Sequence, residues 1–472
     1  MKNRNNSFIK NLFLLYLFYV IITFVLIFGF KQKNIVSEDF PTINNFISNT
    51  VSNDRIALIE ERELSAKVKI SLIDGAKESL KISYYKIQND EAGDVFFSKI
   101  IEAANRGVKV ELVIDGKLNK ISKNFNGLNY LLTSNPNIEI RYYEPFLFFK
   151  PWTWNNILHD KYIIVDDKIV ILGGRNIGNQ YFAINGEAPI ITKDREVLII
   201  NTDLLNYKDS ALSQINNYFY EVWNSEYTKK VKSNLSKSNI NKASEKQLEL
   251  DKSLIYVKDK HPELFNNSFD FIGMSYPANK ITLINNPLTR YKKFPYIWGT
   301  ITNLINTANS SVFIQSPYVI PTIEMQEFID FDYLKNKKIS ILTNSEYASP
   351  NIFAFSGYLK HRKTLLKNNV DLYEYQGEGS IHAKSYIIDD RISLVGSFNM
   401  DGRSAYLSTE TMFVIDSKDF AKALTDKVKI LENDSMLVND KANIDMVKRV
   451  PILKKVILRG TKVITYFFNY LL

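Results

Sequence analysis

Two of the four histidines in this 472-residue chain begin the same pattern, His-x-Lys-x-x-x-x-Asp. The two copies comprise His159, Lys161 and Asp166, and His382, Lys384 and Asp389. Lysine is at most about a tenth of the chain and aspartate is rarer, so one histidine would acquire both partners by chance with a probability under ~1%. The repetition therefore indicates a duplicated site. His261 and His361 lack such partners, and we expect them to be surface or loop histidines.

Each pattern is followed by a glycine and, three residues later, by an asparagine, Asn176 in the first copy and Asn399 in the second. Side chains alternate along a strand, so a histidine and a lysine two residues apart point to the same face. The aspartate begins a turn, and the returning strand brings the asparagine back beside the histidine. Glycine lets the backbone approach an anion, and asparagine supplies an amide donor. Each copy thus predicts half of an anion-binding site.

Two such halves would surround one phosphoryl group with two imidazoles, two ammonium groups and two amides. Positive side chains can stabilise charge on the equatorial oxygens without a divalent ion, so we predict no metal and no other cofactor. One neutral imidazole would attack phosphorus, and the other, protonated, would donate to the departing alkoxide. A carboxylate bonded to each ring's far nitrogen would fix its tautomer. The downstream candidates for this role are Asp194 and Glu410.

The elements that must position these residues also occur twice. Apolar periodicity predicts, in the first half, a helix ending near 75–79, a strand over 80–87, a helix over 96–107 and a strand over 108–114. The second half predicts a helix over 301–306, a strand over 311–316, a helix over 325–334 and a strand over 338–343. Alternating strands and helices indicate an α/β fold of two similar domains, each a mostly parallel sheet flanked by helices, packed around one shared active site.

The uncharged residues 12–30 are just long enough to cross a hydrocarbon core of about 30 Å as a helix. A cleaved signal peptide is the alternative, but the run is bulky to its end and lacks a small-x-small cleavage site before Lys31. We therefore predict a single-pass anchor in the inner or plasma membrane. The flanking basic residues favour an extracytoplasmic body by a margin too small to decide the side.

Composition limits the remaining possibilities. The net charge of +9 favours anionic partners, either nucleic acid or a membrane surface, and 45% apolar residues suffice for real cores. The absence of cysteine excludes disulfides, thiolate nucleophiles and cysteine-based zinc sites. The predicted segments are a membrane anchor (1–34), a first domain (35–228), a polar linker with a phosphate-binding loop as the alternative (229–262), a second domain (263–430) and a basic amphipathic C-terminal segment (431–472).

The paired motifs resemble those of the phospholipase D superfamily. The segments 173–182, 341–345 and 395–404, together with Thr409 and Glu410, are similar to C-type bacterial cardiolipin synthases, and the resemblance runs from about Ile56 to the C-terminus. It implies two phospholipase D-like domains and a transphosphatidylation. A phosphatidyl group would pass from one phospholipid to a histidine and then to the hydroxyl of phosphatidylglycerol, giving cardiolipin.

The resemblance also implies a role for each residue. His159 would be the nucleophile and His382 the acid and base, with Asp194 and Glu410 orienting the rings. The motif aspartates would organise the site more than they react. Three positions depart from the family pattern: Gly174 replaces a frequent serine, Gly402 a frequent proline and Ser408 a frequent asparagine. None is a motif histidine, lysine or asparagine, so the departures put acceptor choice in doubt and not the chemistry.

Other segments suit a lipid substrate. The aromatic residues of 146–154 could meet acyl chains or the bilayer interface, or else pack in the core. Residues 448–472 mix cations and apolar residues, as expected of a helix on anionic lipid or of a docked structural helix. We expect phospholipid substrates, with phosphatidylglycerol as acceptor and phosphatidylethanolamine as a second candidate donor, and no nucleic acid; the oligomeric state stays open. The alternatives are a hydrolytic phospholipase D, phosphodiesterase or nuclease, and an inactive membrane scaffold, which two intact motifs argue against.

Overall fold

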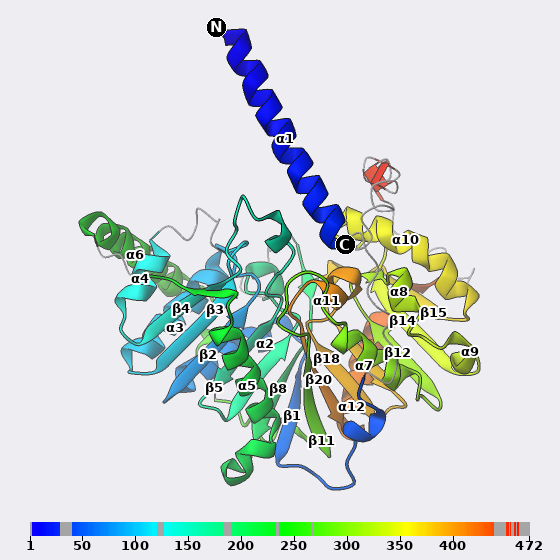
Figure 1. Cartoon of the computed structure of the whole chain (residues 1–472). Coiled ribbons are helices and arrows are strands. Elements are labelled where there is room, and N and C mark those ends of the chain that lie inside the picture. Colours follow the sequence, from blue (N-terminus) through cyan, green and yellow to red (C-terminus); the bar gives the residue numbers. More distant parts are fainter. Residues whose placement is uncertain are drawn as a thin grey trace.

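The computed structural model describes residues 2–28, 40–119, 127–182, 190–232, 236–266, 268–438, 450–452, 454, 457–458 and 460–461. Figure 1 shows two α/β units side by side, with helix α1 (Lys2–Phe28) projecting away from them. Within α1, Ser7–Ile27 is long and apolar enough to cross a membrane, with a mean hydropathy of 2.1 and none of it buried. The helix begins earlier than the predicted uncharged run.

The first sheet has nine strands in the order β10-β1-β8-β6-β5-β2-β3-β4-β9. They are β1 (Asp54–Ile59), β2 (Ser79–Tyr84), β3 (Lys109–Asp115), β4 (Ile138–Tyr143), β5 (Lys161–Val165), β6 (Ile169–Gly173), β8 (Glu196–Asn201), β9 (Thr228–Lys230) and β10 (Tyr276–Pro277). The helices of this unit are α2 (Arg62–Gly75), α3 (Glu91–Asn105), α4 (Leu128–Ser134), α5 (Ala211–Asn224) and α6 (Lys237–Lys260), with the 3-10 turns η4 (Pro151–Thr153), η5 (Asn179–Tyr181), η6 (Leu204–Asp209) and η7 (Pro262–Leu264).

The second sheet has eight strands in the order β11-β20-β18-β17-β12-β14-β15-β21. They are β11 (Lys280–Asn285), β12 (Ser311–Gln315), β14 (Lys338–Asn344), β15 (Asp371–Tyr375), β17 (Ser385–Ile388), β18 (Ile392–Gly396), β20 (Thr411–Asp416) and β21 (Ser435–Leu437). The helices are α7 (Tyr296–Ile305), α8 (Ile323–Gln326), α9 (Phe331–Leu334), α10 (Ile352–Lys367), α11 (Gly402–Tyr406) and α12 (Lys418–Asn433). Two small ladders pair β13 (Val319–Ile320) with β19 (Met400–Asp401), and β7 (Thr192–Lys193) with β16 (Ser380–Ile381).

The two-domain α/β prediction is confirmed, but the prediction of mostly parallel sheets is wrong. Only β2-β3-β4 in the first sheet and β12-β14-β15 in the second are parallel, and the other neighbouring strands are antiparallel. The motif strands are the reason, because each returns through a short turn whose two aspartates have φ near +50°. Aspartate tolerates this left-handed conformation, and so short a turn joins only antiparallel strands.

The predicted polar linker is also wrong, because most of it forms helix α6. Ala243, Leu250, Leu254 and Val257 are buried on one face of this helix, which packs against α3 and α4. Their spacing of seven, four and three residues is helical, but frequent lysine and glutamate around them conceal it. The structure therefore gives no support to a phosphate-binding loop here.

Several predicted boundaries move as well. Phe40 and Phe46 lie in the predicted first domain but pack with the second, Phe40 against Phe294 and Phe46 in the second domain's core. The second domain extends beyond residue 430, since α12 ends at Asn433 and β21 pairs with β15. The predicted helix over 325–334 is two short helices, α8 and α9. His361 is buried on α10 and is not a surface histidine. Most of the predicted C-terminal segment lies outside the described residues.

The domains share a continuous apolar core. It combines residues of the first sheet, such as Tyr162 and Ile199, with residues of the second, such as Val395 and Phe413. Each domain also lends a helix to the other, because α5 contacts β11 and α12 contacts β1 and β10. This exchange fixes the two motif strands, β5 and β17, relative to one another.

Candidate active site

The motif histidines lie just before their strands and not within them. Strand β5 begins at Lys161, which pairs with Tyr84 at the end of β2, and β17 begins at Ser385. Both motif lysines are buried, and each donates from Nζ to the backbone carbonyl of its own histidine. Lys384 Nζ also lies 2.9 Å from His382 Nδ1. Each lysine therefore folds back toward its histidine and holds it at the end of the sheet.

The two histidine-orienting acids are exchanged between the domains. His159 Nδ1 lies 2.9 Å from Glu410 Oε2, and His382 Nδ1 lies 2.6 Å from Asp194 Oδ2. A carboxylate that accepts from Nδ1 keeps the hydrogen of the neutral ring on that nitrogen. Nε2 of the same ring then carries a free lone pair. Each half of the chain thus supplies a histidine to the site and the acid that orients the other half's histidine.

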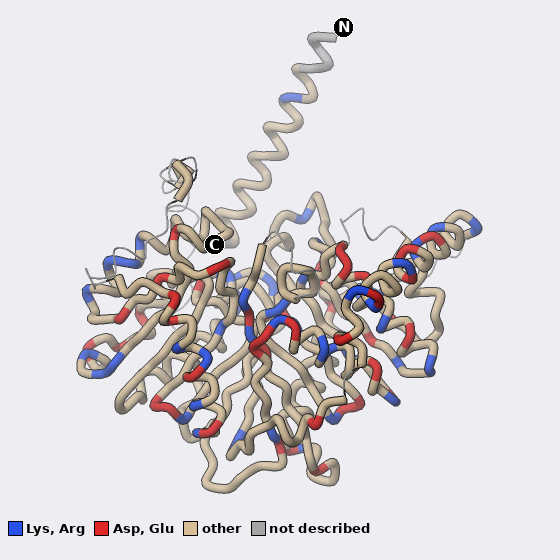
Figure 2. Tube along the Cα trace, turned by 180° about the vertical axis from the view of Figure 1, so that it is seen from behind, with Lys and Arg blue, Asp and Glu red and all other residues tan. Residues whose placement is uncertain are grey.

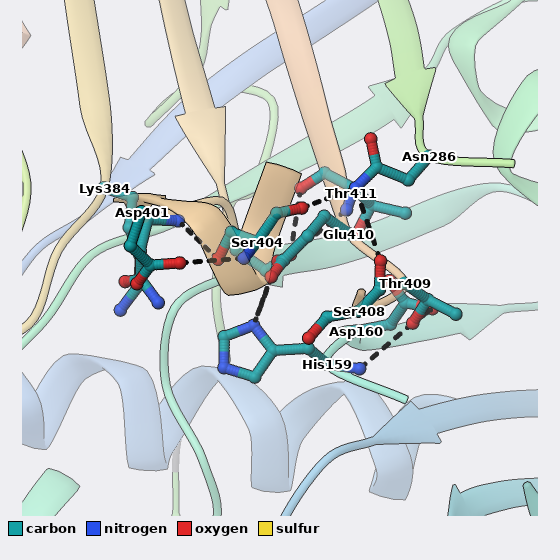
Figure 3. Close-up of polar contacts among 12 residues, drawn as sticks. His159, Asp160, Asn286, Lys384, Asp401, Ser404, Ser408, Thr409, Glu410 and Thr411 are labelled. Atoms are coloured by element: carbon teal, nitrogen blue, oxygen red, sulfur yellow. Dashed lines mark hydrogen bonds and ion pairs between the residues drawn. The ribbon is translucent and has the colours of Figure 1, made fainter. Parts of the chain in front are cut away.

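Backbone contacts across the domain boundary position these pairs. Leu158 forms a parallel bridge with Thr409, whose Oγ1 accepts from the His159 amide at 3.0 Å (Figure 3). On the other side, β7 pairs with β16, and the His382 amide donates to the Lys193 carbonyl at 2.7 Å. Thr409 and Lys193, which make these contacts, directly precede the acids Glu410 and Asp194. Backbone contacts next to each acid therefore support the exchange, in addition to the side-chain bonds between acids and histidines.

The predicted asparagines complete the site. Asn176 and Asn399 are buried, and among the described residues the Oδ1 atom of each has no hydrogen-bond partner. Asn176 Nδ2 donates to the Tyr181 hydroxyl at 3.1 Å. Because a hydroxyl can also donate, the amide could turn and offer its NH₂ group instead. Each amide therefore retains hydrogen-bonding capacity that a phosphoryl group could use.

Residues 70–223 and 301–431 match the family described as cardiolipin synthase, PLD-like domain. The chain belongs to this phospholipase D-like family. Cardiolipin synthase C of Escherichia coli strain K12 is 28% identical over 408 residues, which cover 77% of this chain and 82% of that protein. An uncharacterized protein of Helicobacter pylori strain 26695 is 28% identical over 392 residues, covering 75% of this chain and 74% of the other.

The same architecture occurs in a solved structure, the phosphatidylserine synthase of Haemophilus influenzae. It aligns with a TM-score of 0.62 at 15% identity, covering 88% of this chain and 95% of that one. At this identity the likeness concerns the fold alone. Together, the family match and the intact motifs identify the chain as an enzyme of the phospholipase D type.

Burial and cations set the charge of this phospholipase D-like site. Burial lowers the pKa of His382 to about 4, with Lys384 adding to the effect, and lowers the pKa of His159 well below its usual value. Burial likewise lowers the pKa of Lys161 to about 7 and that of Lys384 to about 8. Both imidazoles are thus neutral at pH 7 before an anion binds, as a nucleophile requires.

The two acids differ in their surroundings. Burial raises the pKa of Glu410 well above its usual range, and Lys161 only partly offsets this. Burial would also raise the pKa of Asp194, but Lys384 and His382 hold it below its usual range. Asp194 is therefore the stronger acid of the two, and the two histidine pairs are not electrostatically equal.

The motif aspartates lie at the opposite end of the strands from the histidines. Asp166 accepts from the backbone amides of residues 77–79 at 2.8–3.0 Å. Asp389 accepts from the amides of 309–311 at 2.7–3.1 Å. These bonds fix the start of β2 and of β12. Grouping the aspartates with the catalytic residues is therefore not supported by their position, while an organising role is consistent with it.

Sequence reasoning missed several neighbours of the histidines. The ring of Tyr85 lies edge-on to His159 with centroids 4.7 Å apart, and that of Tyr181 lies edge-on to His382 at 5.8 Å. Ser397 Oγ donates to Glu410 at 2.5 Å, whereas a Cβ at the equivalent Gly174 would collide with the Asp194 carboxylate. Tyr181 lies within a segment that resembles the family, but only the fold reveals that Tyr85, directly after β2, reaches the site.

Proposed function

We propose that this chain is a membrane-anchored phosphatidyltransferase that forms cardiolipin by transphosphatidylation through a phosphohistidine intermediate. The observation that carries the proposal is the exchanged pairing of His159 with Glu410 and of His382 with Asp194. It supports a single site in which two histidines, two lysines and two asparagines would bind one phosphodiester. The name of the Escherichia coli relative supports cardiolipin as the product.

In the first half-reaction, Nε2 of His159 attacks the phosphorus of a phosphatidylglycerol or phosphatidylethanolamine. A phosphorus–nitrogen bond forms, and the bond from phosphorus to the head-group oxygen breaks. His382 donates its Nε2 proton to that oxygen, releasing glycerol or ethanolamine. The bound phosphodiester anion raises the pKa of the adjacent imidazole, so His382 gains this proton in the complex. Lys161 and Lys384 stabilise the equatorial oxygens.

In the second half-reaction, His382 removes a proton from the terminal hydroxyl of a second phosphatidylglycerol. The alkoxide oxygen attacks phosphorus, the phosphorus–nitrogen bond to His159 breaks, and cardiolipin leaves. Water in place of this hydroxyl would give phosphatidic acid. The assignment of His159 as nucleophile rests on the family resemblance. Mass spectrometry of the parent enzyme quenched during turnover tests it, because the phosphatidyl group should be found on His159 and not on His382.

Helix α1 supports the membrane-anchored part of the proposal by its length and composition. Lys10 is the single charged residue between residues 7 and 28 of this helix, and Figure 2 shows lysine and arginine spread over the body. The charges that flank the span give only a slight preference for an extracytoplasmic body. A reporter fused after residue 472 would decide the side.

The deciding experiment places the full-length protein in vesicles of phosphatidylglycerol, with or without phosphatidylethanolamine, and resolves the lipids. Cardiolipin formation supports the proposal, and the donor follows from whether glycerol or ethanolamine is released. Phosphatidic acid alone would instead make the protein a hydrolase. Cleavage of DNA with unchanged lipids would contradict both lipid reactions. The His159→Ala variant in the same vesicles is the control.

A further inference from the structure

The segment Phe146–Trp154, here called the aromatic loop, presents apolar side chains directly to the surroundings. Phe146, Leu147, Phe148 and Phe149 are consecutive, and Phe148 and Phe149 are 52% and 74% exposed. The loop follows β4 and its tip is ten residues before His159. Four adjacent exposed apolar residues are unusual on a surface that faces only water and indicate a binding partner.

Four consecutive backbone carbonyls of this exposed loop, those of residues 147–150, are paired within the protein. The Tyr16 hydroxyl donates to the Phe148 carbonyl at 2.7 Å, and the Tyr19 hydroxyl donates to the Phe149 carbonyl at 2.9 Å. The Leu147 carbonyl accepts from Trp154 Nε1 and the Lys150 amide, and the Lys150 carbonyl accepts from Thr153. Carbonyls exposed to water need no such partners. In hydrocarbon every one of them must be satisfied internally.

The donors of the two outermost bonds belong to the apolar helix α1. Tyr19 precedes Ile27, the end of the apolar stretch, by eight residues, and Tyr16 precedes it by eleven. At 1.5 Å per residue these hydroxyls lie about 12–16 Å along the helix from that end. The ring of Tyr16 stacks on that of Phe148 with centroids 4.4 Å apart. If α1 spans a bilayer, the tip of the loop is therefore level with the acyl chains.

We propose that the aromatic loop inserts into the bilayer beside α1 and that its partner is the acyl region of the lipid. The proposal rests on the membrane anchor of the proposed function but not on the reaction. The exposed Lys150 follows the apolar tip, and its long apolar stem lets the ammonium group extend toward the head-group region. The loop would hold the histidine end of the sheets against the membrane, so a lipid phosphodiester reaches the site without leaving its leaflet.

The other domain presents apolar side chains at the same end. Tyr347 and Phe353 follow the carboxyl end of β14, and Ile323 follows β13. Ile323 is 70% exposed. By contrast, Leu205 is 96% exposed and lies at the opposite end of the strands from His159. It follows Asn201, whose amide donates to the Lys168 carbonyl at that end. We therefore expect Ile323 of the second domain to contact the membrane and Leu205 to remain in water.

The absence of native cysteine allows a direct test with single spin labels on the full-length protein. Phe149→Cys, Ile323→Cys and Leu205→Cys are labelled and the proteins are placed in vesicles of phosphatidylglycerol and phosphatidylethanolamine. We expect the label at 149 to be more accessible to oxygen than to a water-soluble nickel complex, and the label at 205 to show the reverse. A label at 149 with the aqueous profile of the label at 205 would overturn the proposal. This measurement needs no turnover, so its result does not depend on whether the proposed reaction is correct.

A second test separates membrane contact from substrate binding. In Phe148→Ser/Phe149→Ser, we expect turnover of vesicle lipids to fall at least tenfold, while turnover of a monomeric short-chain phosphatidylglycerol stays within twofold. The matched control, Leu205→Ser, should change neither. Equal loss on both substrates would place the loop in the fold or in the lipid-binding site instead. Unchanged turnover on vesicles would also contradict insertion.

Discussion

At the scale of single residues, each histidine depends on one carboxylate and one lysine, and neither set is complete within one domain. We therefore expect His159→Ala and His382→Ala each to abolish turnover, because attack at phosphorus and proton transfer need both rings. Chelators should leave the rate unchanged, since the lysines supply the positive charge. Product formation from vesicle lipids measures both effects. Full activity in either variant would refute a shared site.

The buried lysines predict the pH dependence. An ammonium group is charged below its pKa, and the pKa values of Lys161 and Lys384 are lowered by burial to about 7 and about 8. We expect kcat/KM for a phosphodiester to fall as pH rises through this range, because the lysines lose the charge that binds phosphate. On the acid side the rate should fall where the nucleophile His159 becomes protonated, and burial places this well below the usual pKa of a histidine.

Lys161→Arg provides the check on that assignment. Arginine keeps its charge at every accessible pH, so the alkaline limb should move upward even if the maximal rate declines. The profile of kcat/KM against pH in the variant and in the parent measures this shift. An alkaline limb that stays in place would assign it to another group.

Gly174 and Ser397 occupy equivalent positions in the two motifs, but only the second has room for a side chain. A Cβ at Gly174 would collide with Asp194, so Gly174→Ala should displace the acid that orients His382. Because a displacement of about 1 Å can cost ~10²-fold in rate, we expect a loss of that order in kcat. Ser397→Ala removes the hydroxyl that donates to Glu410 and accepts from the Thr411 amide, but it introduces no collision and should cost less than about tenfold. Comparable losses in the two variants would argue against the steric explanation.

At the scale of elements, the turn aspartates fix the strands that carry the chemistry. Asp166→Ala removes the acceptor of three backbone amides at the start of β2. We expect a stability loss of about 1–3 kcal/mol, seen as a lower thermal midpoint, with kcat per folded molecule little changed. Asp389→Ala, with the same geometry before β12, should behave alike. Loss of kcat at an unchanged thermal midpoint would instead indicate that the aspartates take part in the reaction.

The elements that sequence predicted best are those with local signals. The parallel strands β2, β3, β12 and β14 follow apolar runs bounded by turn residues, and their predicted limits are within about three residues of those observed. Strand direction elsewhere depends on which partner a strand meets, and this is not a local property. Helix α6 was missed because its buried stripe is narrow and its remaining surface is strongly polar. A polar composition therefore concealed an element that packs on α3 and α4.

At the scale of the whole molecule, the sequence indicated the site residues but not how they combine. The acids Asp194 and Glu410 follow the motifs of their own domains, and no pattern within one domain reveals that each serves the other's histidine. The exchange depends on contacts between residues about 190–250 positions apart, such as the bridge between Leu158 and Thr409. Such pairings arise from domain packing, which local periodicity does not encode.

The packing of the two domains leads to a prediction about Arg195, which follows the acid of the first domain. Its side chain is fully buried, binds both oxygens of Glu60 at 2.7 and 2.8 Å, and donates across the boundary to Gln315 and Ser385 at 2.8 and 2.6 Å. Arg195→Met would leave these groups without their partner. Breaking a buried ion pair costs about 3–5 kcal/mol, so we expect a marked fall in the thermal midpoint.

The position of Arg195 beside Asp194 predicts a second effect in the same variant. Because the guanidinium joins the domains next to a histidine-orienting acid, its loss should lower kcat even at temperatures where the protein stays folded. The matched control is Arg362→Met, which removes an ion pair between a partly exposed arginine and Glu374 within the second domain and leaves Glu374 bonded to the Tyr358 hydroxyl at 2.7 Å. Arg362→Met should lower the midpoint only slightly and leave kcat unchanged. If Arg195→Met behaved in the same way, the guanidinium would not determine how the domains assemble the site.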